Sequence, residues 1–332
     1  MKKIFNYVLL ALITALVLFL ALKDNFNETI HKLVTMKLSY LFLAFLMLFL
    51  FWLCKVLSMH LLIIKEHKDF KLFKTTLLIM RTQFVNAITP FSTGGQPYQV
   101  YYLKKNNIDI GSSTSIIVQN FIVYQIALVF LGIVALFSNY IFGFFPKNHL
   151  LTRLIILGFT INTLVIIVLF VVSFAKKINK KIIKLGITVL TKLRIVKNKE
   201  KTLKKWDNYI NDFHNNATVL LKHKKLFFST IFYNLCALVF LYSIPIFILY
   251  AMGDMNSMNV YEAIIASAYV MLIGSFVPIP GGTGGLEYGF VKFYGFFIHG
   301  SILSATMLIW RFITYYFGLI VGAIAMNIKE GS

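Results

Sequence analysis

Acidic residues and cysteines are both scarce in this chain of 332 residues. Only 12 Asp and Glu stand against 33 Lys and Arg, which gives a formal net charge of +21. Both cysteines, Cys54 and Cys236, lie inside apolar runs, far from any Cys or His partner at metal-ligand spacing. The apolar runs also lack a His/Asp or Cys/His constellation that would indicate catalysis there. We therefore expect no metal site, no cofactor and no enzyme of that kind.

Charge is also absent from several long stretches of the chain. Apolar residues make up 58% of the sequence, and the mean hydropathy is +0.77. Most of the charge-free runs reach the roughly 20 residues that a bilayer-spanning helix needs. The runs are Ile4–Leu22, Leu38–Cys54, Ile110–Pro146, Leu154–Ala175, Leu226–Gly253 and Ala263–Leu286. The sequence therefore predicts an all-α integral membrane protein, a polytopic helical bundle.

The distribution of Lys and Arg predicts how these helices are oriented, because basic loops stay on the cytoplasmic side of a membrane. Basic clusters begin at Lys2, Lys65, Lys104 and Lys176. The connections near residues 138–149 and 253–262 hold little positive charge. We expect about six full spans, the first being Ile4–Leu22 and retained, with both termini in the cytoplasm of a bacterial cell and the chain in its inner membrane.

Two further apolar stretches, about residues 75–103 and 261–300, are interrupted at their centres. Thr89–Pro97 and Val277–Gly285 combine proline, which removes a backbone donor, with glycine, which tolerates positive φ. The charge topology requires each stretch to begin and end on one side. We therefore predict two re-entrant hairpins of opposite orientation whose tips meet in mid-membrane, the alternative being two kinked helices. Paired interrupted segments are typical of transporter substrate sites.

Charged residues within apolar sequence mark the candidate site. Arg311 and Glu287 lie well inside apolar stretches, where an arginine costs roughly 2.5–3.5 kcal/mol. They could form a structural ion pair, or Arg311 could bind a lipid phosphate in a hydrated cavity; these uses are compatible, and we favour the second. Arg81 is another candidate phosphate contact, unless it extends to the cytoplasmic face. Lys55 and His60 are expected at the interface.

The two glycine-rich breaks complete the candidate site. A helix that begins near Leu286 would direct unpaired N–H groups toward the membrane centre, where they favour an anion. The lipid- or phosphate-binding candidates in the breaks are Thr89, Pro90, Gly94, Gly95 and Gln96, and Pro280, Gly281, Gly282, Thr283, Gly284 and Gly285. Gln119, Asn120 and Gln125 are expected to join helices to one another.

The breaks also resemble the signature of a known family. Val277–Gly289 is similar to the Pro-x-Pro-Gly-Gly-x-Gly-x-x-Glu motif in the transmembrane flippase domain of lysylphosphatidylglycerol synthetases, the multiple peptide resistance factor family. Thr89–Leu103 is similar to an upstream threonine-proline and Gly-Gly-Glu-Pro element of that family. Gln96 and Gln99 depart from it, because many members carry Glu and Arg there, so charge recognition at the first hairpin should differ.

The resemblance implies the translocation half of the family's activity. Large members add a soluble aminoacyl-transferase domain that uses lysyl-tRNA, whereas this sequence ends at Ser332, just after the last apolar run. We therefore expect no lysyl transfer. The resemblance implies movement of a lipid such as lysyl-phosphatidylglycerol between leaflets, which in full-length members aids resistance to cationic antimicrobial peptides.

A basic arm, residues 176–225, separates a first membrane half, 1–175, from a second, 226–332. The arm holds 15 Lys or Arg against three acids, which is +12 of the net charge. Apolar residues at spacings of three and four predict an amphipathic helix through Leu203, Trp206, Ile210, Phe213, Ala217 and Leu220. Lysine clusters beside a membrane attract anionic lipid head groups at about 1 kcal/mol per residue, so we favour membrane lipids over nucleic acid as the partner. The stripe could also join two protomers of a homo-oligomer.

A lipid translocase is the function that these features favour together. Its substrate could be a phospholipid, a glycolipid or a polyprenyl-linked lipid. One alternative is an ion- or proton-coupled transporter of small solutes, although Glu287 is the only intramembrane carboxylate that the sequence offers for coupling. Another is a membrane scaffold that partners a separate lipid-modifying enzyme.

Overall fold

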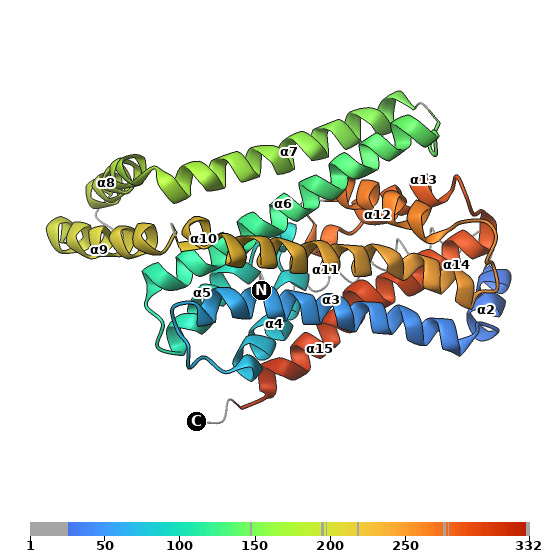
Figure 1. Ribbon diagram of the computed structural model, residues 1–332, viewed down its shortest axis with the longest axis horizontal. Coiled ribbons are helices and arrows are strands. Elements are labelled where there is room, and N and C mark those ends of the chain that lie inside the picture. Colours follow the sequence, from blue (N-terminus) through green and yellow to red (C-terminus); the bar gives the residue numbers. More distant parts are fainter. Residues whose placement is uncertain are drawn as a thin grey trace.

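The computed structural model describes residues 26–329 except for 147, 194, 195, 197, 218, 275, 276 and 278. Every regular element in that part of the chain is a helix (Figure 1). The predicted all-α bundle is therefore confirmed. The first predicted span, Ile4–Leu22, and Pro278 of the second glycine-rich break lie outside the described residues.

Five segments of the described chain are long and apolar enough to cross a membrane. They are α3 (Leu38–Ile64), α6 (Ile110–Phe142), α7 (His149–Phe174), α11 (Lys224–Ala251) and the last helical segment, Gly300–Asn327. The first four match the charge-free runs that begin at Leu38, Ile110, Leu154 and Leu226, and the fifth is the last apolar run before the end of the sequence. The sixth predicted span, Ile4–Leu22, is the one outside the described residues. Helices α3 and α11 pack along each other through the middle of the bundle (Figure 1).

Local capping residues fix where the spans begin and end. Asp109 precedes α6, and its carboxylate accepts a hydrogen bond from the backbone N–H of Ser112 at 2.9 Å. Asn148 caps α7 in the same way through the N–H groups of Leu150 and Leu151. Helix α6 ends at Gly143, whose φ of 63° is the left-handed conformation that favours glycine. These caps satisfy backbone groups that a helix end leaves unpaired.

Both predicted hairpins are present, and their tips touch. The first consists of α4 (Leu72–Ala87), the short turn η1 (Pro90–Ser92) and α5 (Gly95–Lys105). The second consists of α12 (Val260–Gly274), η2 (Pro280–Gly282) and α13 (Gly285–Tyr294). The turns η1 and η2 contact each other. The helical breaks and the meeting of the tips are thus confirmed, whereas entry into a bilayer by one face each stays a prediction.

The two ends of the bundle differ in charge. Figure 1 shows α8 (Lys176–Lys192) and α9 (Lys199–Ala217), the two long helices of the basic arm, at one end, with the connection between α3 and α4. The opposite end holds α2 (Phe26–Val34), the connection between α6 and α7, and the connection between α13 and α14. This separation agrees with the orientation predicted from Lys and Arg.

The last span is not a uniform α-helix. Helix α14 (Gly300–Arg311) passes into a π-helical turn, η3 (Phe312–Tyr316), before α15 (Phe317–Asn327). Helix α15 packs against α4 of the first hairpin, and α14 contacts α13 of the second. The span therefore touches both hairpins, with its π turn between the two contacts.

The basic arm contains more than the one helix predicted. Helices α8, α9 and the short α10 (Val219–Lys222) follow one another, and α9 packs against both α6 and α8. Of the predicted stripe, Ile210, Phe213 and Leu220 are buried, so these three side chains pack within the chain. A second stripe is exposed on α8, made of Ile178, Ile182, Leu185 and Val189.

Candidate functional site

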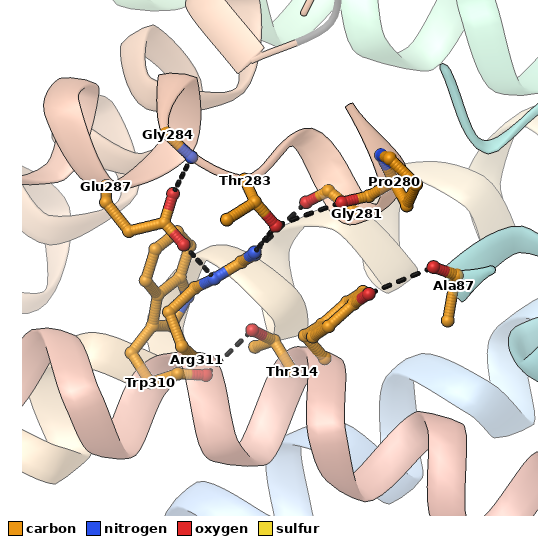
Figure 2. A network of polar contacts seen from close by, with 10 residues as sticks. Ala87, Pro280, Gly281, Thr283, Gly284, Glu287, Trp310, Arg311 and Thr314 are labelled. Carbon is orange, nitrogen blue, oxygen red and sulfur yellow. Dashed lines mark hydrogen bonds and ion pairs between the residues drawn. The ribbon is translucent and has the colours of Figure 1, made fainter. Parts of the chain in front are cut away.

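Arg311 lies at the end of α14, where it meets the second hairpin (Figure 2). Its Nε is 2.6 Å from Oε1 of Glu287, and only 8% of either side chain is exposed. Its Nη2 donates hydrogen bonds to the carbonyl of Gly281 at 3.1 Å and to Oγ1 of Thr283 at 3.2 Å. Of the two uses considered for Arg311, the structural ion pair is therefore present.

Glu287 also caps the N-terminus of α13. Its Oε2 accepts a hydrogen bond of 2.6 Å from the backbone N–H of Gly284 (Figure 2). A carboxylate at this position is stabilised by the unpaired N–H groups and the positive end of the helix dipole. The sequence suggested a lipid phosphate for this place, but the chain's own carboxylate takes up at least one of the donors.

Tyr315 joins the two tips from the π turn. Its hydroxyl donates to the carbonyl of Ala87, at the end of α4, at 2.9 Å. Its ring lies against Gly281, where an added Cβ would come within 2.1 Å of a ring carbon. Gly281 also has a φ of 66°, so two independent constraints require glycine there. Gly281 thus permits the close approach of the last span to η2.

The first tip is held by short side chains. Thr89 Oγ1 donates to the carbonyl of Val85 at 2.8 Å and accepts from the N–H of Gly94 at 3.1 Å. Asn86 Oδ1 accepts from the N–H of Gly95 at 2.9 Å. Of the candidates in this break, Thr89, Pro90, Gly94 and Gly95 shape the turn, and Gln96 lines the neighbouring cavity.

A cavity of about 630 Å³ lies between the two tips and helices α3, α6, α7 and α11. Four residues predicted for the site line it, namely Gln96, Gly281, Gly282 and Arg311. Its other polar lining residues include Lys55, Gln83, Asn86, Gln99, Asn120, Gln125 and Asn162. Apolar side chains such as Phe51, Phe121, Leu128, Val165 and Leu241 complete the wall. The cavity therefore offers polar and apolar surface together inside the bundle.

A sequence model described as the lysylphosphatidylglycerol synthase TM region matches residues 7–322, which include both hairpins and every cavity residue. The chain belongs to this family. A UPF0104 membrane protein from Archaeoglobus fulgidus is 28% identical over 304 residues, which cover 86% of this chain and 85% of that protein. The resemblance found in the two breaks is thus confirmed, and the protein is a multi-pass membrane protein of the lysylphosphatidylglycerol synthase TM family.

In this member of the family, Lys55 is part of the cavity. Its Nζ donates to Oδ1 of Asn234 at 3.1 Å and lies 4.2 Å from the centre of the Tyr124 ring. The interfacial position predicted for Lys55 is wrong, because the side chain turns inward between α6 and α11. Like Arg311, Lys55 is a lone cation with apolar residues on both sides, but that pattern fits an interfacial position as well as an inward one.

Amide side chains support Lys55 and connect the surrounding helices. Asn234 Nδ2 donates to Ser58 Oγ at 2.8 Å, and Ser58 Oγ donates to Asn120 Oδ1 at 3.4 Å.

Gln125 Nε2 donates to Asn162 Oδ1 at 3.3 Å and so links α6 to α7. The helix-joining role predicted for Asn120 and Gln125 is confirmed, and both also line the cavity. Gln119 donates to Ser115 of its own helix at 2.9 Å.

Arg81 is buried elsewhere. Its Nε donates to the carbonyl of Ala325 at 2.9 Å and its Nη2 to that of Ile328 at 2.7 Å. The guanidinium thus caps the end of α15, where a helix leaves carbonyl groups unpaired and favours a cation. The structure therefore does not bring Arg81 together with Arg311 in the cavity.

His60 connects α3 to the start of the first hairpin. Its Nδ1 lies 3.0 Å from Thr75 Oγ1, and the ring is half-buried. It does not line the cavity.

Proposed function

We propose that this protein is a lipid translocase, which moves a phospholipid or a related amphiphile between the leaflets of a bacterial cytoplasmic membrane. The observation that carries the proposal is the cavity of about 630 Å³, which is lined by spanning helices and by the two touching hairpin tips. Irregular backbone at membrane depth persists where it lines a water-filled cavity or is buried in protein. The amide side chains that line the cavity suit a lipid head group, and its apolar side chains suit the first part of the acyl chains.

An ion- or proton-coupled transporter of small solutes is less well supported. Coupling through a carboxylate requires a group that gains and loses charge during transport. Within the described residues, no Asp or Glu lines the cavity, and Glu287 is already paired with Arg311 and with the N–H of Gly284. A scaffold for a separate enzyme would not need this polar cavity. The matched family is a transmembrane region, which fits a function carried out within the membrane such as translocation.

We also propose that α8 lies on the membrane surface. Its exposed stripe of Ile178, Ile182, Leu185 and Val189 is flanked by exposed lysines at 177, 181 and 184. Apolar side chains beside lysines are typical of helices that lie in the interface of an anionic leaflet. The arm would then hold the cytoplasmic end of the bundle close to anionic lipid.

Exchange of labelled lipids in proteoliposomes tests the main proposal. The purified chain should accelerate transfer of a fluorescent lipid to the inner leaflet, where a membrane-impermeant quencher cannot reach it. Phosphatidylglycerol, lysyl-phosphatidylglycerol, a glycolipid and a polyprenyl phosphate should be compared. No protein-dependent exchange of any of them would refute the translocase.

A matched pair of substitutions on α7 links such exchange to the cavity. Val165 lines the cavity, whereas its neighbour Leu164 faces outward and is 53% exposed. Val165→Trp should fill part of the cavity and slow exchange several-fold. Leu164→Trp should leave exchange near the unsubstituted rate. Equal exchange by two well-folded variants would show that lipid takes another route.

A further inference from the structure

Lys55 is a half-buried cation in the cavity wall, and no carboxylate among the described residues forms an ion pair with it. Within the described chain its ammonium has one hydrogen-bond partner, Asn234 Oδ1, and one aromatic face, that of Tyr124. An ammonium carries three N–H donors, so part of its capacity remains for a ligand. An unpaired charge inside a membrane protein is costly, and such residues usually mark a substrate or ion pathway.

Arg311 differs from Lys55 because its charge is balanced. Glu287 pairs with Nε, while Gly281 and Thr283 accept from Nη2. Counting the cavity-lining cations Lys55 and Arg311 and the carboxylate bound to Arg311 leaves one positive charge, that of Lys55. The cavity is therefore electrostatically suited to an anion.

The rest of the polar lining consists of neutral groups. Gln83, Gln96, Gln99, Asn120 and Gln125 supply amide donors and acceptors. Such groups bind hydroxyls well and tolerate a phosphate beside them. Among the described residues that line the cavity there is no carboxylate to pair with an ammonium group. A head group carrying lysyl ammonium groups would instead face the uncompensated charge of Lys55.

We infer that Lys55 binds the phosphate of the transported lipid, and that the cavity selects anionic, hydroxyl-bearing phospholipids over their cationic lysyl esters. This inference rests on the proposed translocase and assigns its substrate class. The inferred substrate therefore differs from lysylphosphatidylglycerol, the lipid named in the description of the family. Lys55 contributes a charge-assisted hydrogen bond, and Arg311 holds the second tip in the wall of the same cavity.

Binding in detergent tests the inference without requiring translocation. Dioctanoyl phosphatidylglycerol should raise the melting temperature of the unsubstituted protein, and its lysyl ester should do so at roughly tenfold higher concentration or not at all. Loss of a charge-assisted hydrogen bond corresponds to about tenfold in affinity, so Lys55→Gln should weaken binding of the anionic lipid by about that factor. Lys55→Arg should retain most of the binding, and Lys55→Glu should reverse the preference.

Two controls sharpen the result. Lys104→Gln removes an exposed lysine at the end of α5 and should bind as the unsubstituted protein does. Glycerol 3-phosphate, which has the phosphate but no acyl chains, should give no shift; an equal shift would show a site for free phosphate and overturn the lipid assignment. Equal stabilisation of the unsubstituted protein by the lysyl ester would overturn the selectivity even if every Lys55 variant misfolds.

The outcomes for binding and for transport are distinguishable. If dioctanoyl phosphatidylglycerol binds in a Lys55-dependent way but proteoliposomes show no exchange, the translocase proposal fails and the lipid site stands. If exchange occurs but Lys55→Gln moves phosphatidylglycerol at the unsubstituted rate, the translocase stands and the role of Lys55 is refuted.

Discussion

Arg311 and Glu287 form a buried ion pair, 2.6 Å between Nε and Oε1, that joins the last span to the second hairpin. The two partners are not equivalent. The carboxylate can take up a proton if its partner is lost, whereas the guanidinium remains charged at any ordinary pH.

We therefore predict that Glu287→Gln destabilises the protein more than Arg311→Gln does. Breaking a buried pair costs about 3–5 kcal/mol when an uncompensated charge is left behind. Thermal unfolding in detergent measures both effects, with Arg153→Gln on the exposed side of α7 as a control expected to melt normally. If Arg311→Gln melts as the unsubstituted protein does while exchange is lost, Arg311 contacts lipid directly, as the sequence alone favoured.

Substitution of Gly281 should weaken the contact between the hairpin tips. Gly281→Ala places a Cβ 2.1 Å from the Tyr315 ring and forces a residue with a side chain to adopt a φ of 66°. We expect a loss of about 1–3 kcal/mol in unfolding free energy. Gly186→Ala on α8 is the matched control, because an added Cβ there meets nothing within 4 Å. Equal melting of the two variants would show that the tips rearrange freely.

Arg81 should affect stability and not lipid preference. Arg81→Gln removes charged donors from the carbonyls of Ala325 and Ile328 and should cost about 2 kcal/mol. The ratio of exchange rates between phosphatidylglycerol and its lysyl ester should be unchanged in the folded fraction. A changed ratio with normal melting would assign Arg81 to the lipid pathway.

The position of α8 can be followed by a fluorescent probe. Leu185→Cys, labelled with an environment-sensitive dye in a Cys54→Ala, Cys236→Ala background, should report an apolar setting in vesicles that contain phosphatidylglycerol. Replacing Lys177, Lys181 and Lys184 by Glu should reduce that signal, since each lysine near an anionic surface contributes about 1 kcal/mol. A signal independent of lipid charge and of salt would contradict the surface position.

Much of this fold follows from local rules. Pro90 and the glycines after it end α4, and the charge pattern then requires a hairpin rather than a crossing helix. The direction in which a given side chain points around its helix axis is harder to predict from a single sequence. Lys55 has apolar neighbours on both sides, so either an inward or an interfacial position fits until Asn234 and Tyr124 are placed beside it.

Hydrogen bonds between residues far apart along the chain are also hard to predict from the sequence. Arg81 meets the carbonyl of Ala325, 244 residues along the chain, and no spacing rule connects them. Glu287 and Arg311 were paired correctly because both are exceptional charges in neighbouring apolar segments. The candidates in the glycine-rich breaks share a motif, but the fold divides them between turns and cavity wall.

The π turn at Phe312–Tyr316 gives the last span a change of register. A π turn accommodates one extra residue, which rotates the helix beyond it by about 100° relative to a continuous α-helix. Arg311, just before the turn, bonds to the second hairpin, and Tyr315, within it, bonds to the first through Ala87. If the turn relaxed to α-helical winding, these two contacts could not both be kept. The π turn therefore sets the rotation that lets one helix bond to both hairpins at once.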